Sequence, residues 1–447
     1  MKTETLKRYS AAEVVLLAVF ALGLLLSLML TKVRNKIELD TPVELAVGGL
    51  AVSLPKGTEW ETAGGWRYEG DNAFVLLGRM GSRGRVVIDV RWRYALCDDP
   101  VSAELRLKQL ADSANGQLLP LGKAPGPLAM QYGRIYAPTD SGEEFLMGVA
   151  RLDFGRSLEL LISYRSDAAL AENVFLALAG GAAYQRQDAM TAGAEQVQRF
   201  YADRMGQLSD PNGPRNIGFL IQNGDKQPLG YAVHRLSLSN RDQESRLHIA
   251  TRQFELSGLY LESNLWLTDA DLSFKWKTQT WLAQLGQPRV AELVADAAGR
   301  LSVEQNTEHQ RFLYRTPMML PEPLLAAFVA WLKGAEGEGM IVDVLTGGGL
   351  VVPTRLTMID PAESAGRSEQ AVRVVRAEYL YRQGEFDDLG FDAAGRLLLI
   401  AEKKPQKPAR LWEATSQERL RGIFGERFTP RGVEAAWRMP KNLSANN

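Results

Sequence analysis

The longest apolar run of the chain lies near its amino terminus. Residues 14–30 read VVLLAVFALGLLLSLML, in which no residue is charged. As a helix this run spans about 26 Å, close to the thickness of a bilayer's hydrocarbon core. It is longer than the core of a signal peptide, and residues 28–32 offer no small-residue cleavage site. The pattern therefore predicts a retained transmembrane helix over residues 14–31, with anchoring positions at Val14, Leu17, Phe20, Gly23, Ser27 and Leu30.

The charges beside this run leave its orientation open. Three basic residues lie before it in the head of residues 1–13, and three more lie after it, up to residue 36. The positive-inside rule is therefore tied. Because a single amino-terminal anchor with a short head usually exports the rest of its chain, we expect a single-pass protein of the cell membrane with its body on the exoplasmic or periplasmic side.

Beyond the run, short alternating segments predict a first domain over residues 41–185. Strand-like runs up to residue 92 are followed by a helix, for which Asp99 and Pro100 suit the N-cap and the first helical position. Strand-like runs then resume, and residues 168–179 predict a last helix. This order indicates an antiparallel sheet with helices on one face.

A polar helical linker, residues 186–213, leads to longer strands over residues 214–402. The clearest alternation sets Leu272, Phe274 and Trp276 against polar neighbours. Residues 321–334 begin with prolines, end with glycine and are apolar nearly all round, which predicts a buried helix. The expected fold class is therefore α+β: a transmembrane helix, an antiparallel sheet with helices on one face, and a curved antiparallel half-barrel wrapped on a buried helix.

Two segments resemble known families. Residues 50–60, LAVSLPKGTEW, are similar to an early strand and turn of the PsbP/Mog1-like family, whose members act chiefly in binding or assembly. Residues 219–231, FLIQNGDKQPLGY, and 390–397, GFDAAGRL, resemble strands of LolA-like envelope domains. LolA carries lipoprotein acyl chains in its concave face. By this resemblance, the following residues line a ligand cavity or fill the core: Phe274, Trp276, Leu324, Phe328 and Trp331.

Candidate catalytic and metal-binding residues are few. The chain has one cysteine, Cys97, and its histidines are His234, His248 and His309, which fall in the other expected domain. Pairing His234 with His248 across a hairpin would set Leu236 against a charged residue, whereas placing Leu236 opposite Leu247 buries both leucines. We therefore expect no metal site and interpret Cys97 as a core residue.

The remaining motifs also have structural explanations. Residues 347–349 are three glycines before a strand-like run, so we interpret them as a hairpin turn rather than a phosphate loop. The pairs Asp269 with Asp271 and Asp387 with Asp388 are assigned to turns, where Asp bonds to local backbone. The sequence thus predicts no catalytic residue, cofactor site or metal site.

Charge adds little to the choice of partner. The formal net charge is −1, which gives no general attraction to nucleic acid. The tail of residues 403–447 is basic, and could contact an anionic membrane surface or an acidic partner, or simply pack as a solvated helix on its own domain. We expect a non-enzymatic, membrane-anchored envelope protein that binds a protein partner through its soluble domains. The alternative is a carrier or sensor of lipid or acyl chains in the half-barrel, and a third is a hydrolase with an unrecognised site.

Overall fold

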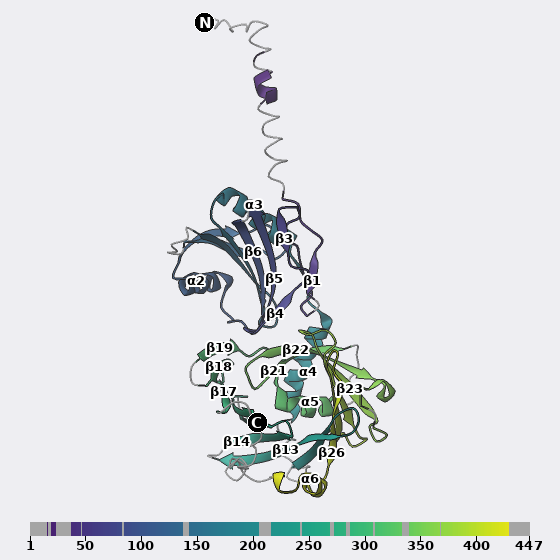
Figure 1. Cartoon of the computed structure of the whole chain (residues 1–447). Helices are drawn as coiled ribbons and strands as arrows, with labels where there is room; N and C mark the ends of the chain where they lie inside the picture. Colours follow the sequence, from purple (N-terminus) through teal and green to yellow (C-terminus); the bar gives the residue numbers. More distant parts are fainter. Residues whose placement is uncertain are drawn as a thin grey trace, which may run out of the picture.

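The computed structural model describes most of the chain in two units (Figure 1). The described residues are 16, 19–23, 37–45, 47–82, 85–136, 143–204, 216–241, 244–268, 272–282, 287–306, 309–332, 339–366 and 368–428.

The amino-terminal unit contains two antiparallel sheets. Its elements are β1 (Val43–Leu45), β2 (Leu50–Val52), β3 (Trp60–Thr62), β4 (Arg67–Glu69), β5 (Ala73–Ser82), β6 (Arg85–Ala95), α2 (Ala103–Ser113), β7 (Gln117–Lys123), β8 (Gln131–Tyr136), β9 (Glu144–Arg151), β10 (Ser157–Tyr164), α3 (Ala168–Gly181) and β11 (Ala183–Tyr184). The larger sheet has the order β3-β5-β6-β10-β9-β8-β7 with β4 beside β5, and the smaller has the order β1-β2-β11. In β6, Ile88, Val90 and Trp92 alternate with polar residues and are fully buried, so this face forms the core with α3.

The second unit is one curved sheet of fifteen strands, which we call the barrel. Its elements are β12 (Asn216–Gln222), β13 (Pro228–Arg241), β14 (Glu244–Glu255), β15 (Leu259–Thr268), β16 (Phe274–Leu282), β17 (Arg289–Ala295), β18 (Arg300–Gln305), β19 (His309–Tyr314), β20 (Met319–Pro321), η1 (Glu322–Leu324), α5 (Leu325–Trp331), β21 (Met340–Leu345), β22 (Val351–Ile359), η2 (Pro361–Glu363), β23 (Arg373–Tyr379), β24 (Phe386–Phe391), β25 (Leu397–Lys403), β26 (Arg410–Thr415), α6 (Gln417–Phe424) and η3 (Gly425–Arg427). The sheet curls around α5 (Figure 1).

The two edge strands of the barrel sheet follow each other directly in the chain. The strand order begins at β19 and ends at β20, and residues 315–318 join these two strands. We call this connection the seam. Neighbouring strands are antiparallel, apart from β20 and β21, which are parallel. After residue 402 the chain returns to the sheet, because β26 lies between β12 and β25.

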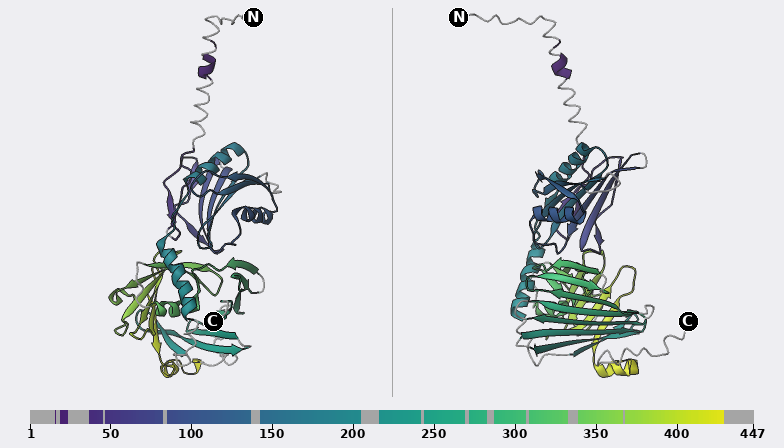
Figure 2. Two further views of the ribbon diagram at one scale, coloured as in Figure 1. Left: turned by 180° about the vertical axis from the view of Figure 1, so that it is seen from behind. Right: turned by 90° about the vertical axis from the view of Figure 1, so that its left-hand side faces the viewer.

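Helix α4 (Asp188–Arg204) connects the units and runs along the barrel (Figure 2). The barrel interior contains α5, whose Phe328 meets Phe200 of α4 with ring centroids 5.3 Å apart. All six residues of β21 are buried, as expected for a strand covered on both faces. On the other side of the sheet, α6 packs through Leu420 and Phe424 against apolar residues of β12 and β13.

The two units contact each other through buried polar groups. The Arg156 guanidinium lies 2.6 Å from the Asp343 carboxylate on β21, and Thr316 Oγ1 donates to the other oxygen of Asp343 at 2.7 Å. Asn72, in the turn between β4 and β5, donates to the Gly349 carbonyl and accepts from the Val351 amide. These bonds fix the first unit against the seam side of the barrel.

The expected α+β fold class is wrong, because the chain is mostly β. Strands make up 49% of the structure and helices 21%. The expected transmembrane helix is corrected with it: among the described residues, no helix is long and apolar enough to cross a membrane. Of residues 14–31, positions 16 and 19–23 are described and helical, and the others lie outside the described residues.

Two local predictions also need correction. Helix α2 begins at Ala103, not near Asp99, because Ser102 is the N-cap and its hydroxyl accepts from the Leu105 amide. In the hairpin of β13 and β14, Leu236 lies opposite Ile249 rather than Leu247. A shift of two residues keeps the same face inward, so the alternation of apolar residues cannot distinguish these registers.

Candidate ligand-binding cavity

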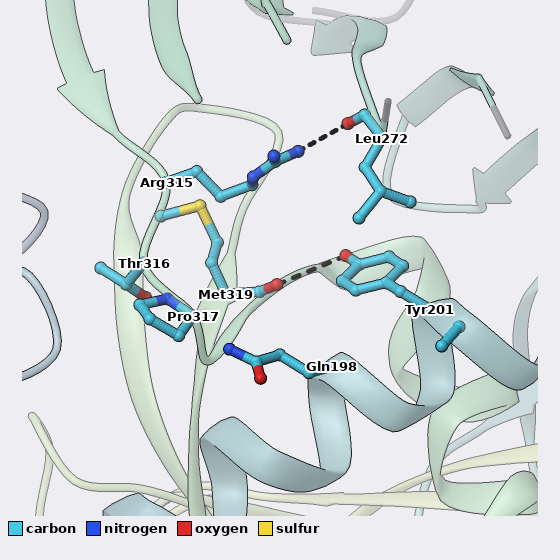
Figure 3. Close-up of a pocket in the computed structure, with 8 residues that line it drawn as sticks. Gln198, Tyr201, Leu272, Arg315, Thr316, Pro317 and Met319 are labelled. Carbon is cyan, nitrogen blue, oxygen red and sulfur yellow. Dashed lines mark hydrogen bonds between the residues drawn. The ribbon is translucent and has the colours of Figure 1, made fainter. Parts of the chain in front are cut away.

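A cavity of about 470 Å³ lies where α4 crosses the seam of the barrel (Figure 3). Three groups of residues line it. These are Gln198, Tyr201 and Ala202 of α4, Leu272 before β16, and Arg315, Thr316, Pro317 and Met319 of the seam and β20. The side chains of Gln198, Ala202 and Pro317 are exposed, so the cavity is open to solvent on one side.

The position of α4 depends on one glycine. A Cβ atom added at Gly193 would lie 1.8 Å from the Ile341 carbonyl oxygen of β21. Only glycine therefore allows the helix to approach the strand this closely. One turn further along, Val197 and Phe200 are buried in the core. Gln198, Tyr201 and Ala202 are thus directed toward the seam.

Of the described residues that line the cavity, Arg315 alone is charged. It is half-buried, and one guanidinium nitrogen donates to the Leu272 carbonyl at 2.7 Å. Its own amide donates to the Gly299 carbonyl at 2.7 Å, which fixes the start of the side chain. Within the described part of the chain, Arg315 has no carboxylate within ion-pair distance.

Tyr201 supplies a neutral hydroxyl. This group donates to the Met319 carbonyl at 3.3 Å (Figure 3). Burial raises the pKa of Tyr201 well above its usual value, and the nearby Arg315 opposes that shift. The phenol therefore stays protonated and neutral across the physiological range, and its one hydrogen is used in the bond to the Met319 carbonyl.

The remaining walls are mostly apolar. Leu272, Pro317 and Met319 present hydrocarbon or thioether surface. Leu272 adopts a left-handed backbone conformation with φ of 57°, which is uncommon for a branched residue and costs on the order of 1–2 kcal/mol. Thr316 contributes little polarity, because its hydroxyl already donates to Asp343.

The lining of this cavity combines a few polar groups with apolar surface. Its described lining contains no Asp, Glu, His or Cys side chain that could serve as a base or acid–base pair. It offers one cation, one phenol and one amide beside apolar surface. Among the described residues, no group of three or more His, Cys, Asp or Glu residues is arranged to hold a metal ion.

The residues predicted from the LolA-like resemblance lie elsewhere. Phe274, Trp276, Leu324 and Phe328 are buried in the main core, and Trp331 packs against it. The Trp276 indole donates to Ser263 Oγ at 2.8 Å, so its polar atom is satisfied within the barrel wall. None of the five lines the seam cavity.

The predicted anchor positions are only partly described. Phe20 is helical and exposed, and a Cβ added at the helical Gly23 would meet no described atom within 4 Å. Val14, Leu17, Ser27 and Leu30 lie outside the described residues.

The histidines and the cysteine are spread over the fold. His234 lies opposite Thr251, and burial lowers its pKa to about 4. His248 stacks on Trp266, with ring centroids 5.0 Å apart. Cys97 is buried, and burial raises its pKa.

The acidic pairs differ from what the sequence indicated. Asp387 and Asp388 lie within β24, not in a turn. Asp388 is fully buried and pairs with Arg376 at 2.8 Å, whereas Asp387 faces the other side and accepts from the Tyr379 hydroxyl. Asp269 and Asp271 lie outside the described residues.

Sequence reasoning missed every polar residue of the cavity. Tyr201 and Gln198 belong to a helix that reads as a polar linker, and Arg315 follows a strand as many exposed arginines do. The available signal was the break of strand pattern at residues 315–317, Arg-Thr-Pro, between two apolar runs. That break indicates a connection but not that the sheet closes there.

Comparisons with known proteins identify no family. No family model matches the chain, and no curated protein matches it. Among solved structures, a β-barrel-like protein of the domain of unknown function DUF1849 from Brucella abortus is 9% identical, with a TM-score of 0.32, over 45% of this chain and 96% of its own. A DUF1089 family protein from Pseudomonas aeruginosa is 16% identical, with a TM-score of 0.24, over 39% of this chain and 90% of its own. At these scores the likenesses carry no argument, and the barrel-like architecture follows from the strand order of this chain itself.

Proposed function

We propose that this protein is a non-enzymatic binding protein whose seam cavity takes a small, partly apolar molecule. The observation that supports this most directly is the lining of the cavity, in which a few polar groups converge on apolar walls. Sites for small molecules generally have this composition, and their volumes are typically about 300–1,000 Å³. The cavity of about 470 Å³ falls within that range.

Carriage of acyl chains inside the barrel is less well supported. The space that a chain would occupy is filled by α5, and Leu324, Phe328 and Trp276 are at most 2% exposed. A lipid would have to displace a packed core, whereas the seam cavity needs no rearrangement of that core. The protein partner and the cell-envelope location stay predictions, since no contact in the structure tests either.

The proposal is tested by closing the cavity from α4. In Ala202→Trp, the indole would extend from an exposed position into the cavity, so the fold should tolerate it while the ligand is excluded. Ala114→Trp, at an exposed position after α2, is the matched control. The full-length chains are purified natively, and small molecules released on denaturation are identified by mass spectrometry.

We expect one compound in near-stoichiometric amount from the wild type and from Ala114→Trp, and at least tenfold less from Ala202→Trp. Equal recovery from all three chains would contradict the seam cavity as the site. Conversion of the recovered compound on incubation with the wild type would contradict a non-enzymatic role.

A further inference from the structure

We infer that the ligand of the seam cavity carries an anionic group, a carboxylate or a phosphate, which Arg315 binds while a short apolar body lies against Leu272 and Met319. This inference rests on the proposed function, and it adds the chemical class of the ligand. It is carried by the charge, bonding and surroundings of Arg315.

The first step concerns the charge of Arg315, which no described residue compensates. The guanidinium of Arg315 is half-buried, yet no carboxylate of the described residues pairs with it, and no acidic side chain among them lines the cavity. By contrast, the more buried Arg156 pairs with Asp343. A cation partly removed from water loses hydration that a counter-ion would restore. An anionic ligand supplies that counter-ion, and a cationic ligand would be repelled.

The second step concerns geometry. The guanidinium has five N–H donors in a fixed fork, and one of its nitrogens is held by the Leu272 carbonyl. The Gly299 carbonyl holds the backbone of the same residue. The side chain is therefore oriented before any ligand arrives, so binding costs little side-chain entropy. A planar or tetrahedral oxyanion matches the remaining donors of the fork better than a single acceptor does.

The third step concerns the rest of the lining. The Tyr201 phenol is neutral and already donates its hydrogen to the Met319 carbonyl, and the exposed Gln198 amide is neutral as well, so neither adds a negative charge that would repel an anion. Leu272, Pro317 and Met319 form the apolar walls beside Arg315, as Figure 3 shows. A molecule with one charged end and a short hydrocarbon portion fits both parts.

The test uses four probes that share a six-carbon chain: hexanoate, hexyl phosphate, hexylamine and hexanol. Binding to the purified full-length chain is measured by titration calorimetry in a buffer without charged detergent. The variants are Arg315→Gln, which removes the charge, and Arg315→Lys, which keeps the charge but not the fork. Arg419→Gln, exposed on α6, is the control. Near-ultraviolet circular dichroism establishes that each variant has the wild-type fold.

We expect hexanoate, hexyl phosphate or both to bind the wild type and Arg419→Gln, and to bind Arg315→Gln at least tenfold more weakly. The affinity of Arg315→Lys for these anions should lie between the affinities of the wild type and of Arg315→Gln. Raising the salt concentration should weaken binding. The ratio of hexanoate to hexyl phosphate affinity identifies which anion the site prefers.

The failures of the two proposals are distinguishable. If hexanol or hexylamine binds as tightly as the anions, and Ala202→Trp abolishes that binding, the cavity is a ligand site and the anionic class is wrong. The class is also wrong if Arg315→Gln retains its fold and binds the anions unchanged. If no probe is affected by Ala202→Trp, the cavity itself is not the site.

Discussion

At the scale of single residues, Asp387 has the most strongly perturbed carboxyl group with a defined partner. It lies in β24 opposite Glu402 of β25 and accepts from the Tyr379 hydroxyl. Burial raises the pKa of Asp387 to about 7; the Tyr379 bond and Lys404 oppose this, whereas Glu402 and Glu322 add to it. The pKa values of Glu402 and Glu322 are raised as well, chiefly by burial. The folded chain therefore holds a proton here that the unfolded chain has released.

This carboxyl group should make stability depend on pH in a defined direction. Between about pH 4 and pH 7 the folded state binds one more proton at Asp387 than the unfolded state, so the free energy of unfolding falls as pH rises. Asp387→Asn keeps an acceptor for Tyr379 but has no proton to lose. As pH rises through this window, the free energy of unfolding of Asp387→Asn should increase relative to that of the wild type by up to a few kcal/mol, since one pKa unit corresponds to about 1.4 kcal/mol.

Urea denaturation at pH 4.5 and pH 7.5 measures this difference. Asp112→Asn, at an exposed position of α2, is the control and should show no comparable change. A wild type and an Asp387→Asn variant whose stabilities differ by the same amount at both pH values would contradict the raised pKa.

Asp387 and Asp388 also show what the sequence cannot reveal about single residues. Two adjacent aspartates are typical of turns, because the side chain bonds to local backbone. Here they face opposite sides of β24, and each has its own partner, Tyr379 or Arg376. Those partners come from β23, which lies beside β24 only once the sheet has formed. The local pattern therefore carried no information about them.

At the scale of elements, α4 contributes more than its composition suggests. The sequence predicted a polar helix in this region, and the helix is present. Its packing between β21 and α5 uses a stripe of buried apolar residues, Met190, Ala194, Val197 and Phe200, together with Gly193, which lets the helix approach β21 closely. The sequence pattern did not reveal which elements this stripe meets. The prediction of a buried helix over residues 321–334 rested instead on apolar residues all round, and η1 with α5 occupies residues 322–331.

Replacing Gly193 by alanine should show whether close packing against β21 outweighs the higher helix propensity of alanine. Alanine favours an exposed helix by about 1 kcal/mol over glycine, but here its Cβ would collide with the Ile341 carbonyl of β21. We expect Gly193→Ala to lower the free energy of unfolding by about 1–3 kcal/mol, as overpacking does. Moving α4 should also weaken ligand binding in the seam cavity.

The matched control is Gly422→Ala in α6. A Cβ at Gly422 meets no described atom within 4 Å, so only the helix propensity changes there. This variant should be stabilised by about 0.5–1 kcal/mol. Thermal unfolding of both variants measures the two effects, and equal shifts of the same sign would show that α4 does not approach β21 so closely.

At the scale of the whole molecule, the amino-terminal unit and the barrel share one core. The main apolar cluster runs from the strands of the first unit through α4 and α5 into the barrel. Turns of the first unit contact β19, the edge strand that precedes the seam: the Tyr314 amide donates to the Cys97 carbonyl, and Arg311 donates to the Gly70 carbonyl. The strand patterns in the sequence suggested separate domains, because such patterns do not indicate which turns of the chain contact each other. The sequence could therefore predict strands, but not that the first unit covers the open edge of the barrel.

The buried pair of Arg156 and Asp343 should contribute most to this docking. Both side chains are at most 1% exposed, and Thr316 donates to the same carboxylate. Asp343→Leu leaves the guanidinium buried without a counter-ion, which typically costs about 3–5 kcal/mol. The double variant Arg156→Met with Asp343→Leu removes both charges and should recover most of that loss, because apolar side chains of similar volume can replace a buried pair.

Glu378→Gln, which breaks the exposed pair with Arg355, is the control and should cost at most about 1 kcal/mol. Urea denaturation measures all three, and a single variant no less stable than the double variant would mean that the pair does not hold the units together. Because Thr316 is followed by Pro317 and preceded by Arg315, loss of this pair would also release the seam segment that lines the cavity, so docking of the first unit and ligand binding should weaken together.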